Sequence, residues 1–118
     1  MSSGEGILKL PGGHHYKLLD SIAAASDGVW ISVFQFHAGS LHFMTVGGTV
    51  GLTVQIRGSN APEVPASSAH GAQVGSDQVF STATETVLSI DNCPRWLKAR
   101  VSAWTVGTVS VYGIFRPA

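Results

Sequence analysis

The chain has 118 residues, a length that suits a single domain with one hydrophobic core. Its single cysteine excludes an intrachain disulfide framework. The equal numbers of basic and acidic residues, seven of each, exclude a strongly basic nucleic-acid binder and an acidic tail. Charged residues make up only 12% of the chain, about half of the roughly 25% usual in soluble domains. Such a charge-poor surface favours a subunit covered by neighbouring chains, and the alternative is a small protein kept soluble by its hydroxyl groups.

The N-terminal segment differs from the rest of the chain. It opens with Gly and Ser, so residues 1–13 are predicted to form a flexible arm and residues 14–118 a single β-sandwich domain. Within the arm, Ile7, Leu8 and Leu10 form a short β-capable patch for which the nearby sequence offers no hairpin partner. We therefore predict a strand that docks on the sheet edge of a partner, the alternative being an edge strand of its own subunit.

No targeting or membrane segment is visible in the sequence. The first residues lack a basic start followed by an apolar core, and no apolar run approaches the roughly 20 residues of a membrane-spanning helix. We expect a protein that is made in a cytoplasm and has no membrane partner.

Strand signals dominate the remaining sequence, and helical signals are nearly absent. The stretch 50–57 has the cleanest alternation of apolar and polar residues. Residues 29–36 and 41–46 are predicted to pair as one hairpin, and 95–104 and 108–115 as another. Weaker or shorter strands are predicted at 72–74, 79–82 and 86–90. About eight short strands with frequent turn signals predict an all-β fold, a two-sheet antiparallel β-sandwich with the jelly roll as first choice.

Two predicted strands carry more apolar surface than one buried face needs. In residues 29–36 the large aromatic side chains share one face: Trp30, Phe34 and Phe36. The opposite face of this strand is also apolar. Either the strand is central and covered on both faces, or its outer face meets another chain.

The second such strand, residues 95–104, has a small apolar face and an opposite face that carries Trp96, Lys98, Arg100 and Trp104. Lysine and arginine seldom enter a core unpaired, so both tryptophans are predicted to point outward with them. This face predicts a subunit interface, because Trp and Arg are enriched at interface centres. The alternatives are a surface ladder of cation–π contacts and a platform on which sugars or bases stack.

The sequence offers no recognisable catalytic machinery. The five histidines have no metal-ligand spacing, Cys93 has no histidine partner in sequence, and the acidic residues are scattered. No phosphate-binding glycine loop occurs. We therefore predict no catalytic, metal or cofactor-binding residues and no enzymatic activity.

Three segments together, 51–60, 95–102 and 107–113, resemble small virion proteins encoded in the structural-gene regions of tailed bacteriophages. Several of these are head decoration, or cement, proteins with a β-sandwich or jelly-roll fold. The resemblance spans about residues 28–116, and residues 1–22 match nothing in it. It implies a capsid decoration protein on the virion surface that binds the major capsid protein, stabilises the mature head, and needs no cofactor and no direct nucleic-acid contact. With the low charge, it favours a homotrimer. The alternatives are a lectin-like carbohydrate-binding module and a tail or connector subunit.

Overall fold

The computed structural model describes residues 8–10, 13–33, 36, 38–65 and 71–116, and every regular element within them is a β-strand. The strands pair antiparallel in one continuous nine-stranded sheet. They are β1 (Leu8–Leu10), β2 (Gly13–Ile22), β3 (Ser26–Asp27), β4 (Ile31–Ser32), β5 (Ala38–Ser59), β6 (Ala72–Gln73), β7 (Gln78–Phe80), β8 (Glu85–Ile90) and β9 (Trp96–Arg116). The predicted all-β antiparallel class is confirmed.

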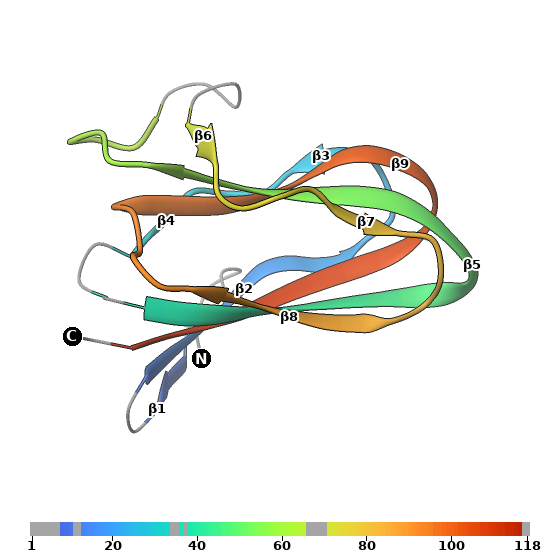
Figure 1. Cartoon of the computed structure of the whole chain (residues 1–118), viewed down its shortest axis with the longest axis horizontal. Coiled ribbons are helices and arrows are strands. Elements are labelled where there is room, and N and C mark those ends of the chain that lie inside the picture. Colours follow the sequence, from blue (N-terminus) through green and yellow to red (C-terminus); the bar gives the residue numbers. More distant parts are fainter. Residues whose placement is uncertain (1–7, 11–12, 34–35, 37, 66–70, 117–118) are drawn as a thin grey trace.

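Two long strands, β5 and β9, form the backbone of the fold. They pair with each other from Ala38 opposite Arg116 to Ser59 opposite Trp96, and both bend near their middle (Figure 1). The bend folds the sheet over on itself into two layers, with β2 and β8 in one layer and β3, β4, β6 and β7 in the other. The layers are therefore two halves of a single sheet rather than two separate sheets.

The bend has a visible origin in the sequence of β5. Before it, the odd-numbered residues of 39–45 are buried, and after it the even-numbered residues of 50–58 are buried. Between these stretches β5 advances from Val46 to Gly51 while β9 advances only from Thr108 to Val106, which is an irregularity of the bulge type. Gly47 has a φ of 144° and Gly107 a φ of 103°, values that side-chain-bearing residues seldom adopt. The bulge lets both halves of β5 turn their apolar side chains toward the same core.

The remaining strands pair in a nested order around β5 and β9. In one layer, β2 pairs with the C-terminal half of β9, and β8 pairs with the N-terminal half of β5. In the other layer, β3 and β4 pair with the N-terminal half of β9, and β6 and β7 with the C-terminal half of β5. The chain is thus arranged like one long antiparallel ribbon that has been rolled up.

Both predicted hairpins are wrong. Residues 95–104 and 108–115 belong to the single strand β9, because Gly107 bends the chain without reversing it and β5 offers a continuous partner to both parts. In the described part of residues 29–36 the strand is the short β4, which pairs with Leu97 and Trp96 rather than with residues 41–46. The strand prediction for 86–90 is confirmed by β8.

The core lies between the two layers. An aromatic group at one end joins three distant parts of the chain: the ring of Tyr16 stands edge-on to Phe36 and Phe115, with centroids 6.2 and 5.5 Å away. All three residues are at most 5% exposed. Phe115 finds room there because Gly39 and Gly113 lie beside its ring. The Phe115 ring therefore packs in space that a side chain at either glycine would occupy.

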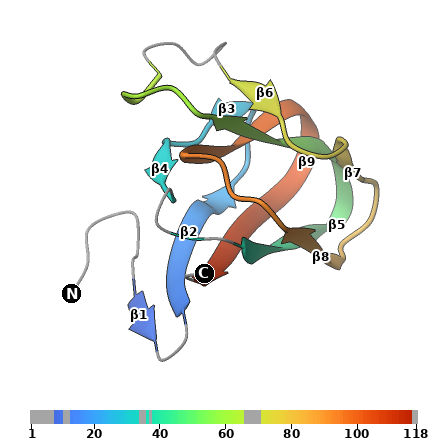
Figure 2. The same cartoon turned by 60° about the vertical axis from the view of Figure 1, so that its left-hand side comes forward.

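The first described residues form a strand on the same subunit. Leu8, Lys9 and Leu10 pair with His15, His14 and Gly13, which places β1 beside β2 (Figure 2). The expectation that this patch lacks a hairpin partner is thus wrong, and the alternative of an edge strand holds for these three residues. Ile7 lies outside the described residues. The flexible arm and its docking on a partner remain predictions.

Candidate functional site

The first three predicted interface residues of β9 share the face of the strand opposite to Leu97 and Ala99, although one of them, Lys98, is buried. Trp96, Lys98 and Arg100 lie opposite Ser59, Arg57 and Gln55 of β5. This row of residues ends at a register shift, since Val101 pairs with Val54 but Ala103 pairs with Thr53. This bulge sets Trp104 opposite Leu52, outside the row. The sequence alternation could not show the shift, because a bulge moves every later side chain by one place.

Lys98 is buried, contrary to its predicted place in an exposed interface. It is 1% exposed, and its Nζ lies 3.2 Å from Asp27 Oδ1 and 4.8 Å from the centre of the Trp30 ring. Arg100 Nε lies 3.6 Å from the same carboxylate oxygen. Strand β3 makes this possible, because Asp27 pairs with Arg100 at the edge of β9. The cations are thus engaged within the subunit.

The other predicted interface residues are engaged similarly. Trp96 donates a hydrogen bond from Nε1 to the carbonyl oxygen of Ala61 at 3.1 Å, and the guanidinium of Arg95 lies 5.9 Å from the centre of its ring. Phe36 belongs to the core and not to a surface, since the chain turns at the hydrogen bond from its N–H to the Val33 carbonyl oxygen. Phe34 lies outside the described residues. The cation–π contacts join Lys98 to Trp30 and Arg95 to Trp96, which are not the pairs of the surface-ladder alternative, and the subunit interface remains a prediction.

Trp104 lies close to the bend, since it pairs with Leu52 and Val106 pairs with Gly51 at the irregularity between β5 and β9. We name the exposed apolar side chains there, Val46, Trp104 and Val106, the bend tip; they are 56%, 38% and 38% exposed. Trp104 donates from Nε1 to the Gly107 carbonyl oxygen at 2.8 Å, which fixes the indole on the surface. Of the three, the sequence had marked only Trp104.

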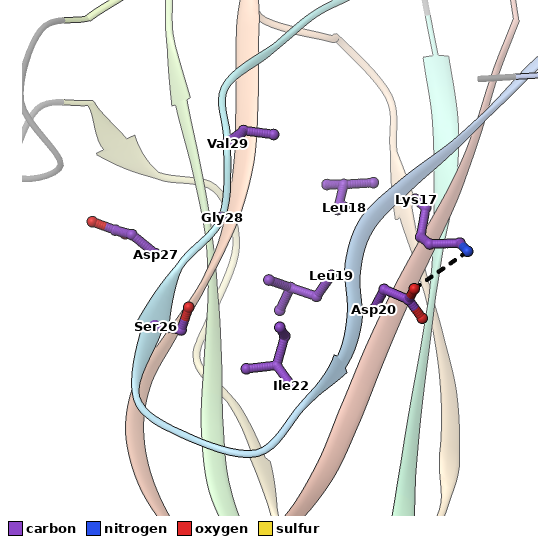
Figure 3. A pocket seen from close by; sticks show the side chains of 9 residues that line it. All are labelled: Lys17, Leu18, Leu19, Asp20, Ile22, Ser26, Asp27, Gly28 and Val29. Atoms are coloured by element: carbon purple, nitrogen blue, oxygen red, sulfur yellow. Dashed lines mark hydrogen bonds and ion pairs between the residues drawn. The ribbon is translucent and has the colours of Figure 1, made fainter. Parts of the chain in front are cut away.

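A crevice of about 340 Å³ opens between β2 and the segment around β3 (Figure 3). Leu18, Leu19 and Ile22 project into the space between the two ribbons. Both leucines are buried because β2 has register shifts on either side of Leu19. The charged groups at the rim are paired, Lys17 with Asp20 at 3.5 Å and Asp27 with Lys98. The walls are aliphatic and offer a hollow without reactive groups that converge on it.

The neighbouring stretch of β2 is irregular. Ser21 has a φ of 54° and donates its backbone N–H to Ser110 Oγ at 2.9 Å. Bulges and irregular backbone at a sheet edge hinder the addition of a further strand. The crevice is therefore a poor place for another chain to extend the sheet.

A second hollow, of about 220 Å³, lies on the outer face of the layer that contains β2 and β8. We name its lining the ring patch: His15, Ser40, His42, Tyr112 and Ile114. They come from three neighbouring strands, β2, β9 and β5. The sequence analysis missed this face. The signal in the sequence was the alternation of the outward Ser40 and His42 with the buried Leu41 and Phe43. The predicted alternation had covered only the second half of β5.

Burial shifts the pKa values of two titratable groups. Within the described residues, no three or more His, Cys, Asp or Glu side chains gather closely enough to hold a metal ion. Burial raises the pKa of the Cys93 thiol, which lowers the fraction of reactive thiolate. Burial also raises the pKa of the Tyr16 hydroxyl in the core. In the part of the chain that the structure describes, no helix is long and apolar enough to cross a membrane.

Comparison with known proteins shows the fold. No protein-family model matches the chain, and no curated protein matches it significantly in sequence. Among solved structures, the crystal structure of the SPBc2 prophage-derived protein YomS is similar with a TM-score of 0.61. The alignment covers 92% of this chain and 96% of that chain, at 16% sequence identity. At this identity the likeness establishes a shared architecture over nearly the whole of both chains.

Proposed function

We propose that the chain is a virion structural protein of a tailed phage, and specifically a capsid decoration protein that stabilises the mature head. The observation that carries this proposal is the near full-length structural likeness to a prophage-derived protein. The resemblance of residues 28–116 to small virion proteins supports it independently of the fold.

We also propose that the fold is a jelly roll, and the nested strand order supports this. In a jelly roll, an antiparallel ribbon of eight strand segments is wrapped so that the outermost segments pair with each other, as do the inner ones. Here β2 pairs with the end of β9, β3 and β4 with its beginning, β8 with the beginning of β5, and β7 with its end. With β5 and β9 each counted as two segments, this is the wrapped order.

The bend tip is the surface that we assign to the capsid contact. Exposed apolar side chains that gather at one end of a molecule favour association with a partner, and tryptophan is enriched among residues that dominate interface energies. Burying apolar surface contributes about 25 cal/mol per Å². A small contact of this kind, repeated over a shell, would resist the pressure that packed DNA exerts on joints between capsid subunits.

The proposal includes the assembly state and the mode of action. The protein acts as a homotrimer at the capsid surface, binds the major capsid protein, and needs no catalytic step, cofactor or direct nucleic-acid contact. The support is the low charge of 12% with zero net charge, which leaves little repulsion between copies. Light scattering that gives only the 12.3 kDa monomer at high concentration would contradict the trimer.

Co-sedimentation tests the capsid contact. Purified protein is mixed with expanded capsids and with isolated tails of the phage that encodes it, and both particles are pelleted. Saturable binding to capsids is expected. Binding to tails alone would favour a tail or connector subunit, and binding to neither would contradict a role in the virion.

A further inference from the structure

The ring patch occupies the middle of a sheet face, and the register of four strands defines it. Across the sheet, Tyr112 of β9 lies opposite His42 of β5, which in turn lies opposite Val87 of β8. In the next row His15 and Ser40 lie on either side of Ile114. Cross-strand partners share a face of the sheet, so all of these side chains point to the same side.

Three rings lie close together on this face, with Tyr112 near both histidines. The Tyr112 ring centre is 6.2 Å from that of His15, at an interplanar angle of 34°, and 6.4 Å from that of His42, at 51°. All three rings line the hollow of about 220 Å³. Ile114, which is 41% exposed, adds an aliphatic wall.

One of these rings is held in place by a carboxylate. His42 Nε2 lies 2.7 Å from Glu85 Oε1 on the neighbouring strand β8. The side chains of His42 and Glu85 remain 40% and 63% exposed, so both keep groups that can hydrogen-bond to a ligand. Ser40 adds a hydroxyl within the lining. The patch thus combines flat apolar surface with polar groups at its margin, the usual make-up of a small-molecule site.

This composition selects among ligand classes. A nucleic acid needs a track of cations, yet Lys17 beside the patch is paired with Asp20 at 3.5 Å and Glu85 adds negative charge. A peptide that extends the sheet needs a free edge, whereas the patch lies between β2 and β8. A neutral pyranose ring needs neither a track of cations nor a free sheet edge. Its C–H face packs on aromatic rings, and its hydroxyls hydrogen-bond to polar groups at the margin.

We propose that the ring patch binds one pyranose residue of a neutral polysaccharide, with the rest of the glycan chain passing over the open face. The hollow is smaller than the roughly 300–1,000 Å³ of a drug-sized ligand pocket, which suits a single sugar residue. This would give the protein an attachment function beyond the capsid contact, on a face separate from the bend tip.

The test uses the full chain and a glycan array of neutral hexose and N-acetylhexosamine oligosaccharides, followed by titration calorimetry with the bound ones. Wild-type protein is expected to bind at least one of them with a Kd in the micromolar to millimolar range. Tyr112→Ala should weaken that binding at least about tenfold, and Tyr112→Phe, which keeps the ring, should retain it within about threefold. Trp96→Ala is the matched control, since it removes an aromatic side chain on the other layer and should leave binding unchanged.

Thermal melts establish that each variant is folded, and His42→Ala replaces Tyr112→Ala if the latter does not fold. The proposal is overturned if no neutral oligosaccharide on the array binds at millimolar concentration. It is equally overturned if binding survives both Tyr112→Ala and His42→Ala, or if Trp96→Ala abolishes it.

Discussion

Lys98 and Asp27 form an ion pair whose lysine is withdrawn from solvent: Nζ lies 3.2 Å from Oδ1, and the side chains are 2% and 28% exposed. Removing one partner of a buried pair is costly, because the remaining charge stays in a poorly solvated place. Asp27→Ala should therefore lower the free energy of unfolding by about 3 kcal/mol, measured by urea denaturation.

The reciprocal change should behave differently. Lys98→Met removes the buried charge and keeps the aliphatic stem beneath Trp30, so its free energy of unfolding should stay within about 1 kcal/mol of wild type. Asp27 keeps Arg100 as a partner in this variant. If Lys98→Met is as destabilising as Asp27→Ala, the pair itself stabilises the fold, and the account in terms of desolvation fails.

Gly39 should tolerate no side chain. A methyl group there would collide with the Phe115 ring and approach the Ile114 carbonyl oxygen to 2.8 Å. Gly39→Ala should cost about 1–3 kcal/mol of stability, as overpacked cores do. Gly48→Ala is the control, because no atom lies within 4 Å of the added methyl group, and it should change stability by less than about 0.5 kcal/mol. Equal effects of the two substitutions would contradict the packing described around Phe115.

Stability should decline at alkaline pH partly because of Tyr16. Burial raises the pKa of its hydroxyl above the ordinary value of 10.0, so the unfolded chain releases this proton at lower pH than the folded chain. The contribution is fully present below about pH 10 and is lost as the pH rises through the folded pKa. The Cys93 thiol acts in the same direction from its ordinary value of 9.0.

Tyr16→Phe isolates the tyrosine contribution, because all other groups are shared. Urea denaturation between about pH 8 and pH 11 should show that the variant loses less stability than wild type over this range. Parallel pH profiles for the two proteins would mean that Tyr16 ionises as readily in the folded state as in the unfolded state.

The bend tip can be tested without disturbing the core. Trp104→Ala should lower the free energy of unfolding by about 1–3 kcal/mol, because the residue is 38% exposed and its indole donates to Gly107, so a thermal melt first establishes that the variant is folded. It should weaken capsid binding at least about tenfold, since loss of an interface tryptophan commonly costs 2 kcal/mol or more. Val79→Ala is the control and should leave capsid binding unchanged. Val79 is an apolar residue on β7 that is 71% exposed. Co-sedimentation at a series of protein concentrations measures both.

The sequence predicted the all-β class and the alternation in residues 50–57, because strand patterning is local. It did not predict that β5 and β9 are continuous, since Gly47 and Gly107 look like chain reversals when their partner strand is unknown. The burial of Lys98 was likewise out of reach. Its charge is compensated by Asp27, a residue distant in sequence that β3 brings to the edge of β9.

The sequence did not predict the ring patch for a related reason. Tyr112 and His42 are neighbours only through the β5–β9 register, so neither strand alone marks a site. The predicted Trp96, Lys98 and Arg100 row did form, but Trp104 left it at a bulge that alternation cannot reveal. Properties set by one strand could be predicted here, and those set by pairing between distant strands could not.

The composition of purified virions tests the central proposal most directly. Particles of the phage or prophage that encodes the chain are banded by density, and the protein is quantified by mass spectrometry against the major capsid protein. The account predicts a fixed, high copy number that stays with DNA-filled heads after tails are removed. Absence of the protein from heads, while other structural proteins are recovered in full, would contradict it.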